Sequence, residues 1–185
     1  MTQQRNLALR RLLAFLVDYG VMVLFVAVLS VAGFAIRGQL GVTPSAPPTF
    51  QQKLLAQALI VATVTLPIVL YFAVSESSRW QATIGKRVLR LQVKADRGGR
   101  PPLRRTLLRA VAKFAPWELA HTGIWHVPGT PFVSEPAAFS YAIWITAMLL
   151  ALWWFASLWV GDGRTPYDRI AGTVVTRCAQ RPSPK

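Results

Sequence analysis

Long uncharged runs alternate with short polar segments along this chain. Three runs, Leu12–Ile36, Leu54–Val74 and Ala137–Val160, are each twenty residues or longer and carry almost no charge. A helix of about 20 apolar residues spans the ~30 Å hydrocarbon core of a bilayer. The pattern therefore predicts three membrane-spanning helices, with Pro67 as a kink in the second.

The segments between these runs carry weaker local signals. Gly41–Pro48 is rich in proline and predicts a non-helical external loop. Glu76–Lys113 is strongly basic, and within it Leu89–Val93 alternates apolar and polar residues with the period of a half-buried strand. Asp96–Gly99 then predicts a turn, and Gly172–Thr176 is a second β-prone run. We therefore expect a small two-stranded ladder between the two runs.

Lysine and arginine are distributed very unevenly among the connecting segments. Three precede the first predicted span, two lie between the first and second, eleven lie in Glu76–Lys113, none in Phe114–Pro136 and five in Gly161–Lys185. Cytoplasmic loops of membrane proteins carry an excess of these residues. The rule predicts an inner-membrane protein with both termini and the basic segment in the cytoplasm and Phe114–Pro136 outside. That topology requires four crossings.

The fourth crossing falls on Leu103–Ala120, a segment that contains Arg109, Lys113 and Glu118 and is interrupted by Pro116. One interpretation is a basic amphipathic helix on the inner leaflet, attracted to anionic lipid by about 1 kcal/mol per basic residue. That interpretation leaves an odd number of crossings and places the five basic residues of Gly161–Lys185 outside the cell membrane, against the charge rule. We therefore favour a crossing or a re-entrant helix.

Composition supports a membrane protein and weakens one competing class. Apolar residues make up 53% of the 185 residues, charged residues 15%, and the mean hydropathy is +0.37. A net charge of +14 would also suit a nucleic-acid-binding protein, but that class does not explain apolar runs long enough to span a bilayer. The first run also exceeds the ~7–15 residues of a signal-peptide core, so we expect it to be retained.

Residues suited to metal binding or nucleophilic chemistry are sparse. Cys178 is the only cysteine, and His121 and His126 stand apart from clustered carboxylates. The sequence shows no paired carboxylates, no nucleophile with a base and no metal-ligand spacing. We therefore expect neither an enzyme nor a metal or cofactor site.

Asp18 is the ionisable residue of the first apolar run, and it lies two helical turns after Arg11 on the same helix face. An ionised aspartate at mid-membrane costs about 2.5–3.5 kcal/mol, so its carboxylate must be protonated, hydrated or paired. At a rise of about 1.5 Å per residue, Arg109 and Lys113 reach depths that bracket Asp18. We expect Asp18 to pair with one of them, either as a functional ion site or as a lock between helices.

Two further clusters lie close to the spans. Asp168 follows the last span and is expected at the inner interface, in contact with Arg11 or with its neighbour Arg169. Gln81–Arg87 contains Gly-Lys but lacks the spacing of a phosphate-binding loop, so Thr83 is expected to cap a short interfacial helix. The cations expected to face anionic lipid on the cytoplasmic side are Arg79, Lys86, Arg87, Arg90, Arg104 and Arg105.

Three stretches of the chain resemble the RDD family of membrane proteins, which is named for one arginine and two aspartates. They are Arg11–Asp18, with arginine at the start and aspartate inside the helix; Gln81–Lys86, after the second span; and Tyr167–Thr173, which supplies the second aspartate. Arg90 departs from the pattern, because glycine is common there in similar proteins. The resemblance implies an integral membrane fold with suspected transport of ions or small solutes.

These observations together predict an all-α membrane protein. It has three clear transmembrane helices, one weak charged crossing or re-entrant helix, an amphipathic cytoplasmic segment and the small ladder. Residues 1–181 are expected to form one domain and residues 182–185 a disordered tail.

Two functional hypotheses follow from this fold. The leading one is a transporter or conducting element for an ion or small solute, with Asp18 as its ionisable site and a path formed between the protomers of a homo-oligomer. In this hypothesis Arg11, Arg109 and Lys113 modulate the charge of Asp18, and residues near Asp168 help to close the inner mouth. The alternative is a membrane scaffold or assembly factor whose basic segment binds anionic lipid or an acidic membrane-protein partner.

Overall fold

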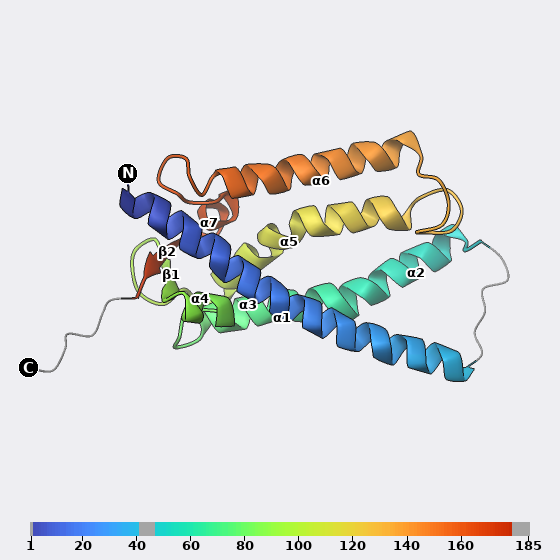
Figure 1. Ribbon diagram of the computed structural model, residues 1–185, viewed down its shortest axis with the longest axis horizontal. Coiled ribbons are helices and arrows are strands. Elements are labelled where there is room, and N and C mark those ends of the chain that lie inside the picture. Colours follow the sequence, from blue (N-terminus) through green and yellow to red (C-terminus); the bar gives the residue numbers. More distant parts are fainter. Residues whose placement is uncertain (1, 41–46, 179–185) are drawn as a thin grey trace, which may run out of the picture. The chain divides into compact units, whose positions relative to one another are not determined.

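The protein is mostly helical, and the computed structural model describes residues 2–40 and 47–178 (Figure 1). Among these described residues, three helical segments are long and apolar enough to cross a membrane, namely Gln4–Gln39, Phe50–Ser77 and Ala138–Ala156. A two-stranded antiparallel sheet accompanies them. The predicted class, an all-α membrane protein with a small β ladder, is confirmed.

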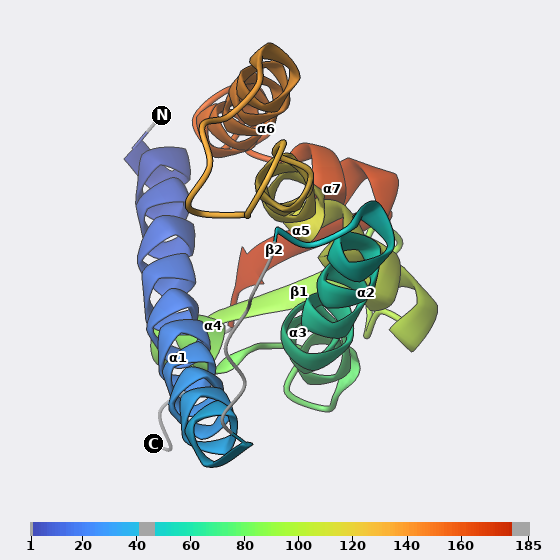
Figure 2. The same cartoon turned by 90° about the vertical axis from the view of Figure 1, so that its right-hand side faces the viewer.

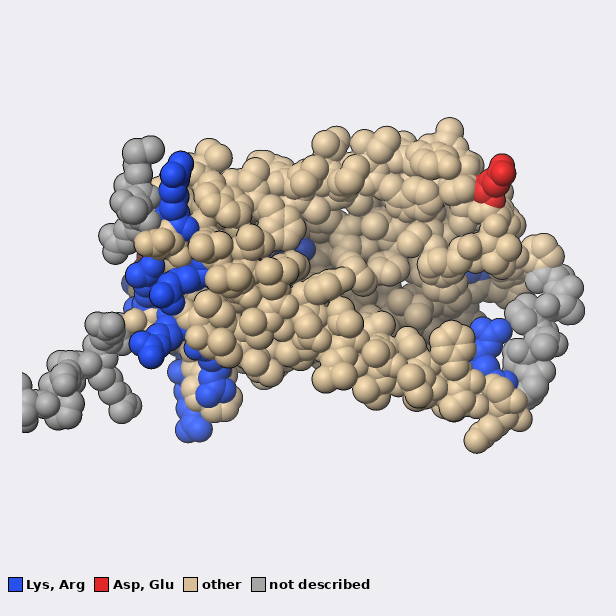
Figure 3. Space-filling view, in the orientation of Figure 1, with Lys and Arg blue, Asp and Glu red and all other residues tan. Residues whose placement is uncertain are grey.

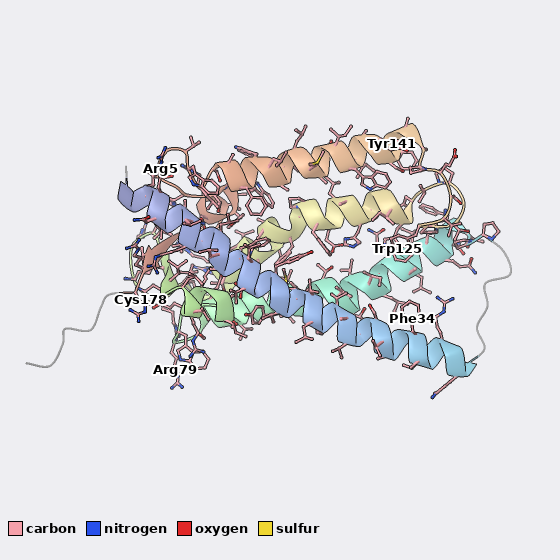
Figure 4. All side chains as sticks on the ribbon, viewed as in Figure 1. Arg5, Phe34, Arg79, Trp125, Tyr141 and Cys178 are labelled. Atoms are coloured by element: carbon pink, nitrogen blue, oxygen red, sulfur yellow. The ribbon has the colours of Figure 1, made fainter. Side chains whose placement is uncertain are left out.

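Helix α1 (Thr2–Leu40) is a single helix that extends the predicted span Leu12–Ile36 at both ends. Its apolar side chains beyond Gly20 are largely exposed, as expected for a surface that faces lipid; Phe34, labelled in Figure 4, is 75% exposed. The loop predicted at Gly41–Pro48 is described only at its last two residues, which have no regular structure, and the predicted tail 182–185 lies outside the described residues.

The second predicted span is interrupted by a wider helical turn. It consists of α2 (Phe50–Ile60), the π-helix η1 (Val61–Thr65) and α3 (Leu66–Ser77). The π-helix stands directly before Pro67, whose ring would clash with the carbonyl group four residues earlier in a regular α-helix. The break predicted at Pro67 therefore takes the form of a π-helical segment on its N-terminal side.

The predicted ladder is confirmed. Strands β1 (Leu91–Ala95) and β2 (Thr173–Arg177) lie side by side (Figure 2). They pair antiparallel, with Leu91 opposite Arg177 and Ala95 opposite Thr173. The first strand starts two residues later than predicted and the second one residue later. Alternate side chains of β1 are buried, which is the pattern of a ladder with one face on a core.

Three shorter or more polar helices complete the described residues. Helix α4 (Ile84–Val88) precedes β1, and α7 (Pro166–Ile170) precedes β2. Helix α5 (Leu103–Trp125) includes Pro116 in its interior and is too polar to count among the three apolar spans. Its crossing of the membrane stays a prediction. Helix α6 (Ala138–Ala156) ends four residues before the predicted end of the last span, and Trp159 lies in the turn that follows.

Contacts divide the chain into two compact units. The sheet unit comprises residues 1–20, 70–112 and 154–185, and the helical unit comprises residues 21–69 and 113–153. Helices α1, α3, α5 and α6 each contribute residues to both units. Arg11, Asp18, Arg109 and Asp168 all belong to the sheet unit, so their geometry can be described within it.

The sheet unit has a small apolar core. Ala14 of α1 packs against Leu91 and Val93 of β1 and Val175 of β2, and all four are almost completely buried. Leu7, two turns before Ala14 on α1, packs against the same cluster. The first half of α1 is therefore fixed on the ladder, and this contact sets the direction in which Asp18, one turn beyond Ala14, is presented.

The helical unit is joined internally by hydrogen bonds between polar side chains. Gln57 of α2 donates to the hydroxyl of Thr122 at 2.9 Å, and its amide oxygen lies 2.9 Å from Nε2 of His126. Thr65 of η1 donates to Glu118 of α5. These contacts hold α5 against the second span.

Arg90 occupies a backbone conformation that favours glycine. Its φ angle is +54°, in the left-handed region, between α4 and β1. A residue with a Cβ atom is strained there, and glycine would adopt the same conformation without strain. We expect Arg90→Gly to raise the free energy of unfolding by up to about 1 kcal/mol, measured by thermal unfolding in detergent. Arg97→Gly, a change outside any helix or strand that removes the same charge, should give no such gain.

Candidate functional site

Asp18 is completely buried in the sheet unit, and its carboxylate accepts three hydrogen bonds from neutral groups. The hydroxyl of Thr83 donates to Oδ2 at 2.6 Å. The backbone N–H of Gly85 and the hydroxyl of Tyr71 donate to Oδ1 at 2.8 Å and 3.0 Å. Within residues 2–40 and 47–178, the carboxylate of Asp18 has no cationic side chain within ion-pair distance.

The short helix α4 brings these donors to Asp18. Thr83 is the N-cap of α4, as predicted, and accepts a hydrogen bond from the backbone N–H of Lys86. Gly85 lies so close to α1 that a Cβ atom on it would be 2.1 Å from the carbonyl oxygen of Ala14 and 2.9 Å from Cγ of Asp18. Only glycine allows the two backbones to approach this closely, so Gly85 positions the N–H that binds the carboxylate.

Arg109 of α5 is the centre of a second buried cluster. It is 2% exposed, and one guanidinium nitrogen donates to both carboxylate oxygens of Glu76 at 2.7 Å. Its Nε and other terminal nitrogen lie 2.9 Å from Oδ1 of Asp168. The aromatic ring of Tyr167 lies 5.1 Å from the guanidinium carbon. One guanidinium therefore binds two buried carboxylates from different parts of the chain.

The predicted contact between Arg11 and Asp168 is present. Arg11 donates to Oδ2 of Asp168 at 2.5 Å and to the carbonyl oxygen of Gly163 at 2.6 Å. The same carboxylate accepts from the backbone N–H and the hydroxyl of Thr165. Burial alone would raise the pKa of the Asp168 carboxyl, but Arg109 and Arg11 hold that pKa well below its ordinary value.

Lys86 connects the two clusters. Its ammonium forms an ion pair with Glu76 at 2.9 Å and lies 3.5 Å from the hydroxyl of Thr83, which in turn binds Asp18. A chain of contacts therefore starts at Asp18 and passes through Thr83 to Lys86 and Glu76. It continues from Glu76 through Arg109 and Asp168 to Arg11. The members, called the buried network below, are Arg11, Asp18, Glu76, Lys86, Arg109 and Asp168. Three cations and three carboxylates give it a formal charge of zero when all are ionised.

The predicted pairing of Asp18 with Arg109 is wrong. The guanidinium of Arg109 is occupied by Glu76 and Asp168, and Asp18 is stabilised instead by hydroxyl and backbone donors. Lys113, the predicted alternative partner, belongs to the helical unit, where its ammonium lies 5.4 Å from the ring centre of Phe114.

Arg169 does not form an ion pair with Asp168. It is exposed and pairs with Asp162 at 2.6 Å, an exposed ion pair that contributes about 0–1 kcal/mol. The two residues Asp168 and Arg169 are adjacent in the sequence, but the helix α7 directs their side chains to different surroundings.

The cations predicted at the lipid interface fall into two groups. Lys86 is wrongly assigned, because it is 7% exposed and bound to Glu76. Arg105 is half-buried and donates to the carbonyl oxygen of Gly172 at 3.0 Å. The exposed members are Arg79, Arg87, Arg90 and Arg104.

Glu76 and Tyr71 were not predicted as members of the site. Glu76 stands at the end of an apolar helix and is completely buried, although the sequence shows it only as one of two acids in a basic segment. Tyr71 lies five residues earlier, and its hydroxyl also accepts from the N–H of Ile84 at 3.0 Å. An acidic residue directly after an apolar run, facing a surplus of cations, was the one available signal for Glu76.

The arrangement of side chains in the described residues does not resemble a metal site. Across the described residues, no three side chains of His, Cys, Asp or Glu converge as ligands of one ion.

A family model described as RDD family matches residues 6–172, which is most of the chain. The chain belongs to the RDD family. No curated protein and no solved structure gives a significant match. Arg11, Asp18 and Asp168, the residues that carried the resemblance to the RDD family, are all buried in the sheet unit. In this RDD protein the three residues are linked through Glu76, Lys86 and Arg109.

Proposed function

We propose that this membrane protein transports or conducts protons or small cations, and that Asp18 is the group that binds them. The contrast among the three fully buried carboxylates carries the proposal. Glu76 and Asp168 each have two cationic partners, whereas Asp18 is held by neutral donors. Asp18 is therefore the carboxylate whose charge an incoming proton or cation would directly neutralise.

The groups around Asp18 suit a small cationic solute. The carboxylate, the hydroxyls of Thr83 and Tyr71 and the carbonyl oxygen of Ala14 gather oxygen atoms at one position beside α4. Uptake of one positive charge there would shift the buried network from a formal charge of zero to +1. Lys86, which contacts both Thr83 and Glu76, is the network member through which that change would reach Arg109.

The length of α1 suggests where Asp18 lies in the bilayer. At about 1.5 Å per residue, its 39 residues extend about 58 Å, roughly twice the ~30 Å hydrocarbon core. The segment 19–40 alone is long enough to cross. Asp18 would then lie at the cytoplasmic boundary of the core. A solute would enter from the cytoplasm at this boundary. The proposal keeps the predicted inner-membrane location, cytoplasmic termini and homo-oligomer.

Asp18→Asn tests the proposal. The purified protein in liposomes, with dyes inside that report protons, sodium or potassium, is expected to move at least one of these ions down an imposed gradient of that ion. The substitution should lower this flux at least about ten-fold, because an amide neither takes up a proton at neutral pH nor neutralises a cation. Stability should change little, since the amide oxygen can still accept from Gly85 and Tyr71 and the hydroxyl of Thr83 can rotate to accept from the amide N–H.

Asp162→Asn is the matched control, because it makes the same chemical change at an exposed carboxylate. It should leave the flux unchanged. Protein-dependent flux that persists in a folded Asp18→Asn variant would rule out the proposed role of Asp18.

A membrane scaffold or assembly factor is the second candidate. It is favoured by the contacts of Arg11 and Asp168, because hydrogen bonds and ion pairs within the protein already occupy both charged groups. In that case the buried network holds the sheet unit together and has no solute to bind. Absence of any protein-dependent flux, together with co-purification of one defined membrane protein that survives Asp18→Asn, would select this function.

A further inference from the structure

We propose that α4 and the residues just before it form a docking surface for anionic lipid headgroups. The apolar members of this surface, called the α4 patch below, are Trp80, Ile84 and Val88, and its cationic members are Arg79 and Arg87. The proposal concerns the exposed face of the sheet unit and does not depend on whether Asp18 carries a solute.

The apolar members are exposed and stand next to a membrane span. Trp80 is 51% exposed, Ile84 47% and Val88 65%, and the last two share a helix face because they are four residues apart. Trp80 follows Ser77, the end of the second apolar span, by three residues, so it cannot lie more than about 10 Å beyond that span. An indole at this distance from the end of a membrane helix lies where aromatic belts meet the headgroups.

The cationic members are arranged around the indole ring. The guanidinium carbon of Arg87 lies 4.2 Å from the ring centre of Trp80, and that of Arg79 lies 5.2 Å from it. Within the described part of the chain neither guanidinium has a carboxylate partner. Stacking on an aromatic ring leaves the N–H edge of a guanidinium free to bind the oxygens of a phosphate group.

The opposite face of α4 is fixed to the buried network. Thr83 and Gly85 bind Asp18, and Lys86 binds Glu76. The exposed face is therefore held in place before any lipid binds, which lowers the entropic cost of binding. Figure 4 shows Arg79 projecting away from the ribbon beside α4, and Figure 3 shows that Lys and Arg gather over the unit that contains α4 and the sheet.

The position of the α4 patch favours a lipid over an acidic protein. Exposed apolar side chains between two arginines, within a few residues of a membrane span, match the boundary between acyl chains and phosphate groups. An acidic protein partner would meet the same arginines but would compete with the headgroups for this position. We therefore assign the α4 patch to the phosphate of an anionic phospholipid.

The test uses the full-length protein in nanodiscs of phosphatidylcholine with a minor fraction of phosphatidylglycerol. Native mass spectrometry of the released protein is expected to show phosphatidylglycerol enriched over its share in the disc. The double variant Arg79→Gln/Arg87→Gln should lower this enrichment about ten-fold. Arg97→Gln/Arg100→Gln is the matched control, since it removes the same charge from two exposed arginines between β1 and α5, and it should retain the enrichment.

Four results would overturn the proposal. An equal loss in both double variants would mean that the lipid responds only to overall charge. Enrichment that is unchanged in Arg79→Gln/Arg87→Gln, or absent in the unmodified protein, would remove lipid as the occupant and leave an acidic protein partner. Displacement of the lipid by soluble glycerol phosphate at constant ionic strength would indicate a site for free phosphate instead of a bilayer contact.

Discussion

Arg109→Leu is expected to lower the free energy of unfolding by about 3–5 kcal/mol, more than any other change to the buried network. The substitution leaves Glu76 with Lys86 alone and Asp168 with Arg11 alone, and both carboxylates are fully buried. Removal of one partner from a buried ion pair is costly because the remaining charge has no water to replace it. Thermal unfolding in detergent, followed by intrinsic fluorescence, measures the loss.

Two further variants of α5 test whether the loss of stability comes from the ion pairs of Arg109. Arg104→Leu removes an exposed arginine of α5 and should change stability by less than about 0.5 kcal/mol. Arg109→Lys should fall between the two, because an ammonium keeps the charge but cannot bind two carboxylates with the planar geometry of a guanidinium. A stability of Arg109→Leu equal to that of Arg104→Leu would show that the ion pairs of Arg109 do not hold the fold.

Gly85→Ala should be nearly as damaging, with an expected loss of about 3 kcal/mol or more. The added Cβ would meet the carbonyl oxygen of Ala14 at 2.1 Å, and a backbone atom cannot move aside by changing a rotamer. Helix α4 would have to move away from α1, and the N–H that binds Asp18 would move with it. The same unfolding assay measures the effect, and Gly85→Val should be worse.

Gly20→Ala is the control for this prediction. Gly20 lies in the interior of α1, where a Cβ would meet nothing within 4 Å, so the substitution should be neutral or should stabilise the helix by about 0.5–1 kcal/mol. If Gly85→Ala proves as stable as Gly20→Ala, the close approach of α4 to α1 is not required for folding.

These variants and the flux experiment address different properties. Arg109→Leu and Gly85→Ala test whether the buried network and its close packing stabilise the sheet unit. Asp18→Asn keeps the packing and removes only the carboxylate, so it tests solute binding. A protein that loses stability in the first two variants and keeps its flux in the third would have a structural network and no transport role for Asp18.

Much of the local structure was predictable from the chain alone. Each apolar run became a helix, because about twenty consecutive apolar residues have few other ways to satisfy their backbone in a bilayer. Thr83 as an N-cap and the alternation around Leu91 are also local signals, since each depends on the conformation of a few neighbouring residues. The two strands start one or two residues later than predicted, whereas α1 extends well beyond its predicted span at the N-terminal end.

The sequence by itself determined that Asp18 needs a stabilising environment, because an isolated carboxylate in an apolar helix is costly whatever surrounds it. Only the tertiary structure decided what that environment is. The cations outnumber the acids three to one, so composition cannot tell which arginine meets which carboxylate. Packing of α4 against α1 brought hydroxyl and backbone donors to Asp18, and Arg109 was left to join Glu76 with Asp168. Those pairings depend on side chains more than thirty residues apart, and no local pattern encodes such distances.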